Sequence, residues 1–93
     1  MYEVRTTKQF KSAYKRIARS GKFDRDIFEK IVSLLKEGVP LPPQYYDHTL
    51  TGNLTGRREC HIRGDTLLVY EIHTEIKIIL LDNIGNHAQV FES

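Results

Sequence analysis

The sequence predicts an α+β fold, an antiparallel sheet with a helical hairpin packed on one face. Two observations lead to this prediction. Apolar residues recur at helical spacing in two segments between residues 7 and 37, and strand-like segments follow from residue 57 onward. Helices followed by strands are typical of α+β proteins. With 93 residues, the chain is expected to form a single domain over residues 1–93, in the order β-α-α-β-β-β.

One strand and one helix are predicted at the start of the chain. Residues 2–6 alternate apolar and polar side chains, as a short strand does. Thr6 is the expected N-cap of the helix that follows, with Gln9 as its capping-box partner and Gly21 as its stop. The apolar stripe of this helix consists of Phe10, Ala13, Tyr14, Ile17 and Ala18.

A second helix is predicted from Asp24 to Gly38. Phe23 and Phe28 flank its N-cap at the spacing of a hydrophobic staple. Its wide apolar face consists of Ile27, Ile31, Val32, Leu34 and Leu35. Because the link between the two helices is only about three residues long, they are expected to form an antiparallel hairpin.

The second half of the chain is predicted to be a loop followed by strands. Three prolines and two glycines between residues 39 and 56 indicate an extended loop, and loops of this length are often functional. Strands are expected within RRECHI, TLLVYEI and EIKIILLDNI, joined by short turns. The second of these is almost continuously apolar and should lie centrally. Residues 2–6 should join one edge of the sheet, and AQVFES is compatible with a further short edge strand.

Charge is distributed unevenly along the chain. The net charge is only +2, yet residues 1–22 hold seven Lys or Arg and one acid. A basic face of this kind suits an anionic partner such as nucleic acid, although a solvated helix face would give the same pattern. The bases on the predicted first helix include Lys8, Lys11 and Lys15.

Composition disfavours several classes of protein. No apolar run approaches the ~20 residues of a membrane helix, and the N-terminus has no apolar signal region. The single cysteine, Cys60, cannot form an internal disulfide. Its position in the middle of a predicted strand favours a buried core thiol over a nucleophile. We therefore expect a cytoplasmic protein without a membrane partner.

Four histidines could carry chemistry. His73 lies in a predicted turn and is expected to be simply exposed. His48, His61 and His87 come from different segments. Because the ends of alternate strands in an up-and-down sheet lie on the same rim, these three and Asp65 are expected to share one neighbourhood.

The residues alone leave three interpretations of this group open. The first is unrelated surface histidines. The second is a metal site, but the spacing matches no compact ligand motif, so no metal or other cofactor is predicted. The third is acid–base cleavage of RNA, in which one group accepts the proton of the ribose 2′-hydroxyl and another protonates the departing 5′-oxygen. Such cleavage also needs cations on the phosphate, for which the candidates nearby in sequence are Arg57, Arg58 and Arg63.

The stretch YYDHTLTGNLTGRRECHIRGDTLLVYEI, together with the terminal GNHAQVF, resembles the YafQ family of RelE-type bacterial toxins. The resemblance covers nearly the whole chain and implies a RelE-like fold. It also implies the toxin of a type II toxin–antitoxin system, a cytoplasmic endoribonuclease that enters the ribosomal A site and cuts messenger RNA through the 2′-hydroxyl. Such toxins need no metal or other cofactor and contact 16S rRNA. A cognate antitoxin holds them inactive, in assemblies that can be heterotetramers.

The same resemblance assigns roles to individual residues. Catalytic roles fall on His48, His61, Asp65 and His87, and a supporting, stacking role falls on Phe91. One position departs from the family, because Thr66 stands where members can carry a tryptophan, so base stacking from that position is lost. The alternative function is that of a gyrase-targeting toxin with the same fold, which would need no histidine cluster.

Overall fold

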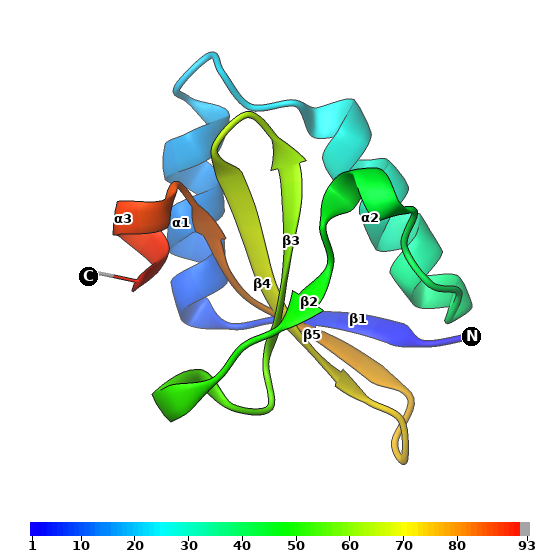
Figure 1. The fold of residues 1–93 in the computed structure, drawn as a ribbon. Coiled ribbons are helices and arrows are strands. Elements are labelled where there is room, and N and C mark those ends of the chain that lie inside the picture. Colours follow the sequence, from blue (N-terminus) through cyan, green and yellow to red (C-terminus); the bar gives the residue numbers. More distant parts are fainter. Residues whose placement is uncertain (92–93) are drawn as a thin grey trace.

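A computed structural model of the chain describes residues 1–91 and contains a five-stranded sheet with two long helices (Figure 1). The strands lie in the order β1-β5-β4-β3-β2. In chain order the elements are β1 Glu3–Thr6, α1 Lys8–Ala18, α2 Arg25–Glu37, the 3₁₀ turn η1 Pro43–Tyr45, β2 His48–Thr49, the 3₁₀ turn η2 Gly52–Leu54, β3 Arg58–Arg63, β4 Thr66–His73, β5 Ile78–Gly85 and α3 His87–Phe91.

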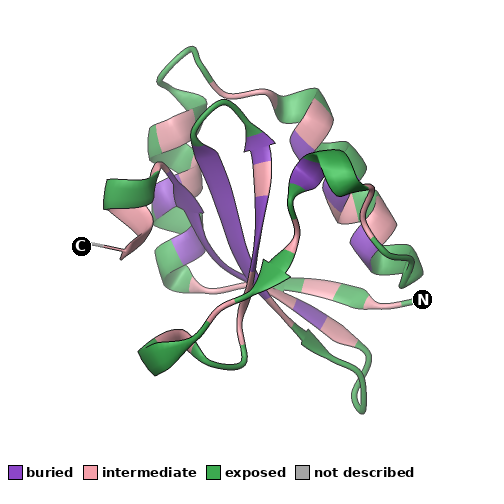
Figure 2. Cartoon of the chain, in the orientation of Figure 1, coloured by how far each residue is buried: buried purple, intermediate pink, exposed green. Residues whose placement is uncertain are grey.

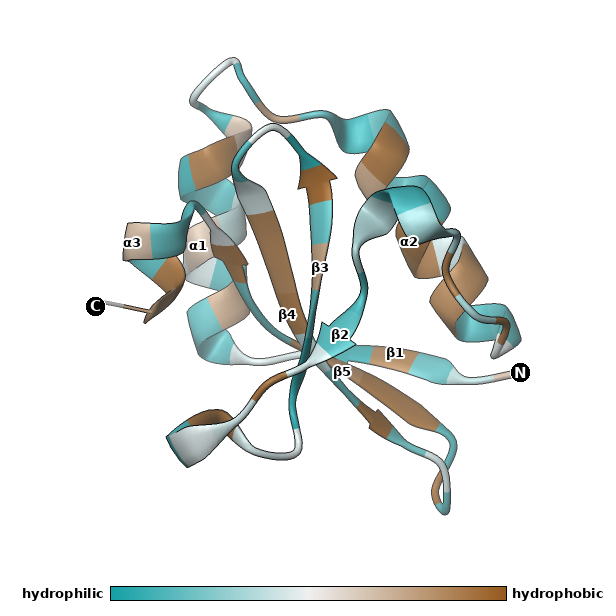
Figure 3. Ribbon diagram, in the orientation of Figure 1, coloured by the Kyte–Doolittle hydropathy of each residue, from teal (hydrophilic) through white to brown (hydrophobic). Residues whose placement is uncertain are grey.

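The predicted α+β class is confirmed, and the apolar strand β4 lies at the centre of the sheet as expected. Figure 2 shows β4 buried over most of its length, and Figure 3 shows a continuous hydrophobic run along it. Strand β1 joins one edge, as predicted, but it pairs with β5 in parallel. The sheet is therefore mixed, with the other three pairings antiparallel.

Helix α1 begins one residue later than predicted. Thr6 belongs to β1, where it pairs with Leu81 of β5. Thr7 is the N-cap, because its hydroxyl oxygen accepts a hydrogen bond of 3.0 Å from the backbone N–H of Phe10. A side-chain acceptor in this position satisfies one of the backbone donors that a helix leaves free at its start. The Thr7 hydroxyl also donates to the Asp82 carbonyl, which ties the helix to the sheet.

Helix α2 has the ends that the sequence predicts. Asp24 caps its N-terminus by accepting from the N–H of Ile27 at 3.1 Å, and Gly38 ends it in the left-handed conformation with φ 75°. The link to α1 spans residues 19–24 and is longer than expected. Aromatic rings from α1, the link and α2 contact one another. These rings belong to Phe10, Tyr14, Phe23 and Phe28, with centroids 5.4–6.2 Å apart.

Both helices cover the same face of the sheet. The core between them and the strands contains Phe10, Ala13, Phe28, Ile31, Leu35, Tyr45, Cys60, Ile62, Leu68, Tyr70, Ile79, Leu81 and Ile84. Cys60 is fully buried there, and burial raises the pKa of its thiol to about 12. A thiol that stays protonated is a poor nucleophile, so Cys60 belongs to the core, as the alternation of β3 predicts.

Two segments differ from the predictions. The loop between residues 39 and 56 contains the short strand β2, which pairs with β3 and extends the sheet. Residues 87–91 form helix α3 instead of an edge strand. The reason is a reciprocal cap, in which the N–H of Gln89 donates to Asn86 Oδ1 at 2.8 Å and the N–H of Asn86 donates to Gln89 Oε1 at 2.9 Å. Glu92 and Ser93, the end of that segment, lie outside the described residues.

Gly85 makes the turn from β5 into α3 possible. Its φ of 154° is rare for residues with a side chain, and an added Cβ would meet Gln89 Oε1 at 2.6 Å.

None of the helices formed by residues 1–91 is long and apolar enough to cross a membrane.

Candidate active site

The face of the sheet opposite α1 and α2, here named the outer face, carries two rows of cross-strand neighbours. One row consists of Glu59 of β3, Val69 of β4 and Asn83 of β5. The next row consists of His61, Leu67 and Gly85. These residues alternate with the core residues of the same strands, so their side chains stand on the other side of the sheet. His61 and the start of α3 are therefore two strands apart on one face.

The outer face brings His48 and His61 together around a single buried carboxylate. Glu59 Oε1 lies 3.5 Å from Nε2 of His48 and 3.5 Å from Nε2 of His61. The Glu59 side chain is only 7% exposed, whereas those of His48 and His61 are 50% and 38% exposed. The pairing of β2 with β3 creates this arrangement, because it sets His48 directly opposite Glu59.

Sequence reasoning missed Glu59 as a member of the site. The signal that could have found it is the alternation of β3, which places Glu59 on the same face as His61. Its role depends on β2, and two residues of strand inside a proline-rich loop leave no recognisable pattern.

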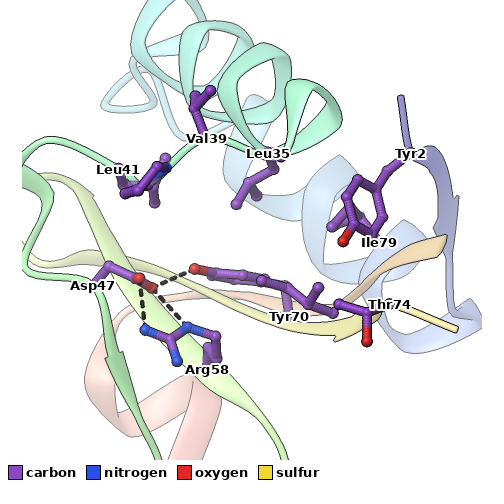
Figure 4. Close-up of a pocket in the computed structure, with 12 residues that line it drawn as sticks. Tyr2, Leu35, Val39, Leu41, Asp47, Arg58, Tyr70, Thr74 and Ile79 are labelled. Carbon is purple, nitrogen blue, oxygen red and sulfur yellow. Dashed lines mark hydrogen bonds and ion pairs between the residues drawn. The ribbon is translucent and has the colours of Figure 1, made fainter. Parts of the chain in front are cut away.

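The loop that carries His48 is anchored on the opposite, core face of the sheet. Asp47 accepts two hydrogen bonds from the Arg58 guanidinium, at 2.7 Å and 3.3 Å, and a short one from the Tyr70 hydroxyl (Figure 4). Burial and the neighbouring Asp47 carboxylate raise the pKa of Tyr70, so its hydroxyl remains a donor. Arg58, a predicted phosphate ligand, is thus bound to Asp47 and is not brought to the histidines.

His87 and Phe91 lie side by side on α3, with ring centroids 4.8 Å apart. Both line a hollow of about 560 Å³ together with Arg57, Val69 and Asn83. Val69 and Asn83 belong to the Glu59 row, so this hollow lies on the outer face, although His48 and His61 do not line it. The structure therefore places His48, His61 and His87 on the outer face, and it stays a prediction that these three and Asp65 form one catalytic site.

Arg57 reaches the same hollow and is flanked by two carboxylates. Its Nε lies 3.6 Å from Glu71 Oε2 and 3.7 Å from Asp82 Oδ2. Burial, and then the adjacent Glu71 carboxyl, raise the pKa of Asp82 to about 7. The interaction with Asp82, followed by His73, lowers the pKa of Glu71. Below about pH 7, where Asp82 is mostly protonated and Glu71 is ionised, this pair holds about one negative charge, which the Arg57 guanidinium balances.

Asp65 and Arg63 lie at the margin of the outer face. Asp65 is exposed in the turn between β3 and β4 and lines a separate hollow with Asn86 and Gln89, the capping residues of α3. It is therefore next to the start of α3 but not in the hollow of His87. Arg63 donates a hydrogen bond of 2.9 Å to Asp24, which draws it towards α2.

The remaining candidates are surface residues. Lys8, Lys11 and Lys15 are exposed on α1, consistent with a basic face. His73 is exposed, as predicted, and lies 2.9 Å from Glu71. Within residues 1–91, no group of three or more His, Cys, Asp or Glu side chains could hold a metal ion.

Comparison with known proteins identifies the family of this chain. The model of the YafQ toxin family, bacterial toxins of type II toxin–antitoxin systems, matches residues 2–92. The chain is 34% identical over 58 residues to the mRNA interferase toxin YafQ of Escherichia coli strain K12, a stretch that covers 62% of this chain and 61% of that relative. The aligned stretch thus spans less than two thirds of that relative.

Solved structures agree over a greater length. The crystal structure of a metal-bound toxin from Helicobacter pylori is similar with a TM-score of 0.89 and 36% identity, covering 98% of this chain and 100% of that chain. A chain of the E. coli DinJ-YafQ complex is similar with a TM-score of 0.83 and 27% identity, covering 98% and 99%. Since the family model spans almost every residue, the chain belongs to the YafQ family of bacterial toxins of type II toxin–antitoxin systems.

Proposed function

We propose that the chain is the toxin of a type II toxin–antitoxin system and an endoribonuclease that cuts messenger RNA in the ribosomal A site. The observation that carries the proposal is that His48 and His61 meet around the buried Glu59 on the outer face, where the hollow lined by His87 also lies. Imidazoles accept and donate protons near neutral pH, which RNA cleavage through the 2′-hydroxyl requires.

In the proposed reaction, a base takes the proton of the 2′-hydroxyl and the 2′-oxygen attacks the adjacent phosphorus. The bond from phosphorus to the 5′-oxygen then breaks, and an acid protonates that oxygen. We assign the acid to His87 and the base to His48 or Asp65, with His61 steadying the phosphate. Arg57 is a better cation for the phosphate than Arg63, because it lines the hollow of His87 while Arg63 is bound to Asp24.

The ribosome is proposed to supply most of the substrate binding. The hollow that His87 lines is bordered by one arginine and no lysine, so it offers few contacts to phosphates and suits a messenger strand that is already held in place. Lys8, Lys11 and Lys15, exposed on α1, are proposed to contact phosphates of 16S rRNA, which would position the toxin without reading sequence. The site of action would then be the cytoplasm.

A cognate antitoxin is proposed as the protein partner. The support is the similarity to a chain of the E. coli DinJ-YafQ complex. We expect the toxin and its antitoxin to copurify, with two copies of each in a heterotetramer. Light scattering of the coexpressed pair measures this mass directly, and a mass equal to one toxin and one antitoxin would contradict the tetramer.

The nuclease proposal is tested in a translating extract. Purified wild type and His87→Ala are added without antitoxin, and messenger ends are mapped by primer extension. Wild type should give new ends within codons, and His87→Ala should lose at least about a hundredfold in rate, as expected for removal of a general acid. Intact messenger with wild type would overturn the proposal. Gyrase supercoiling measured in parallel would then identify the alternative toxin.

A further inference from the structure

Tyr46 presents an exposed aromatic ring next to the histidines. It is 67% exposed, although it lies directly against His61, with ring centroids 5.5 Å apart and an interplanar angle of 64°. One face of the Tyr46 ring therefore remains open beside a residue assigned to the scissile phosphate. Large exposed aromatic rings at a nucleic-acid site are typical stacking platforms for bases.

The backbone of Tyr46 is held in an unfavourable conformation. Its φ of 49° and ψ of 43° are left-handed, and within residues 1–91 the only other non-glycine residue with positive φ is Lys77. A bulky residue adopts this region only where its surroundings dictate it, and such positions cluster at functional sites. A smaller residue, or glycine, would satisfy the turn more easily, so the turn itself does not explain the aromatic ring.

Several anchors fix the backbone at Tyr46. The N–H of Tyr46 donates to the Pro43 carbonyl at 3.0 Å, and its own carbonyl lies 2.8 Å from Nδ1 of His48. The next residue, Asp47, is bound to Arg58 and Tyr70 on the other face of the sheet. The backbone is thus held in place beneath the ring and the ring rests against His61, so little backbone freedom would be lost when a ligand binds.

No other aromatic ring among those described above lies beside His61. Phe91 accompanies His87 on α3. Thr66 has no ring and is only 7% exposed, so it offers nothing to a base. Beside His61, the exposed ring is that of Tyr46.

We propose that Tyr46 is a substrate-binding residue that stacks on a nucleobase flanking the scissile phosphate of the messenger. This inference rests on the proposed nuclease function and adds the ligand group that Tyr46 contacts. Every base has a π-face, so the stacking would add affinity with little sequence preference.

The test uses two substitutions of Tyr46 and one matched control. Tyr46→Asn removes the ring but keeps a residue that tolerates left-handed φ, and Tyr46→Phe keeps the ring and removes the hydroxyl. Ile76→Asn is the control, because Ile76 is similarly exposed, at 65%, and lies in the turn between β4 and β5. Thermal unfolding of each variant shows whether the fold is intact.

Cleavage of ribosome-bound messenger is then measured against toxin concentration. We expect Tyr46→Asn to raise the half-saturating concentration about ten- to a hundredfold, the range for loss of one base stack. Tyr46→Phe should recover most of this loss, and Ile76→Asn should match wild type. Unchanged half-saturation in Tyr46→Asn, or an equal loss in Tyr46→Phe, would overturn the inference.

A second measurement separates this inference from the nuclease proposal. The free protein is titrated with a 2′-O-methyl trinucleotide, which cannot be cut, and the ring protons of Tyr46 are followed by NMR. Stacking predicts upfield shifts of these protons, whether or not the wild type cleaves messenger. Ring protons that do not move would contradict stacking even in an active nuclease.

Discussion

Glu59 Oε1 lies 3.5 Å from Nε2 of His61 on the outer face of the sheet, and Glu59 is almost completely buried. The same oxygen is equally close to Nε2 of His48. A buried carboxylate this close to two imidazoles helps to orient both rings, and orientation is a large part of what an active site must supply. Glu59 is therefore a positioning residue for the proposed reaction.

Replacing Glu59 with Gln should lower the cleavage rate about ten- to a hundredfold, the scale expected when catalytic groups are displaced by about an ångström. The reason is that a neutral amide attracts the two imidazoles less strongly than a carboxylate does. Single-turnover cleavage of ribosome-bound messenger measures the effect. Glu29→Gln, an exposed glutamate of α2, is the matched control and should leave the rate unchanged. Equal rates for the two variants would remove Glu59 from the site.

Tyr70→Phe should reduce the free energy of unfolding by about 1–2 kcal/mol, because it leaves the partly buried Asp47 carboxylate without one donor. Urea denaturation measures this loss. Cleavage should also slow, since Asp47 anchors the loop that carries His48. Tyr14→Phe is the control: the Tyr14 hydroxyl takes part only in an exposed contact of 3.4 Å with Arg25. A Tyr70→Phe variant as stable as Tyr14→Phe would argue against the anchor.

Asp82→Asn should change how stability depends on pH. In the folded protein the pKa of Asp82 is raised to about 7 from an ordinary 3.8, so between these values the native state keeps a proton that the unfolded chain has lost. The free energy of unfolding of wild type should therefore fall as pH rises from about 4 to about 7. Asp82→Asn removes this slope.

Glu71 has the opposite effect on the free energy of unfolding, and in a lower pH range. Its pKa is lowered from an ordinary 4.5, so its contribution is present above that pH and is lost as pH falls further. Urea denaturation at several pH values separates the two effects. Asp26→Asn, an exposed position, should retain the wild-type slope between pH 4 and 7. A slope that persists in Asp82→Asn would show that another group causes it.

Gln89→Ala should impair cleavage about tenfold while costing about 1 kcal/mol of stability or less, as for loss of a helix cap. The Gln89 side chain closes the reciprocal cap with Asn86, and a helix of five residues is too short to be stable without such support. Gln89→Glu keeps the acceptor and should restore most of the activity. Full activity in Gln89→Ala would mean that α3 is held by other contacts.

Deleting residues 87–93, which removes His87 with the rest of α3, should abolish cleavage and leave the sheet and both long helices folded. Cleavage assays and thermal unfolding of the truncated protein measure the two effects.

Local sequence patterns determined the helices and the central strand. Asp24 and Gly38 mark the ends of α2 because capping depends on side chains within a few residues of each other. The apolar run of β4 and the alternation around Cys60 predicted burial, since strand period decides which face a residue occupies. The three histidines of the site were also identifiable, as residue types suited to acid–base chemistry.

Only the tertiary structure decided which polar groups meet. Arg57, Arg58 and Arg63 are equivalent in sequence, yet one faces the hollow of His87, one binds Asp47 and one binds Asp24. The register shifts in the β3–β4 and β4–β5 pairings add to this, because an extra residue in a strand redirects the side chains beyond it.

The parallel pairing of β1, the strand β2 and the turn into α3 were likewise settled by contacts between distant segments. Glu59 acquires its two histidines only because β2 pairs with β3 across the sheet. Local propensity acts over a few residues, whereas an active site is assembled from residues far apart in the chain. Its geometry therefore follows from long-range pairing and packing, which no single segment of the sequence specifies.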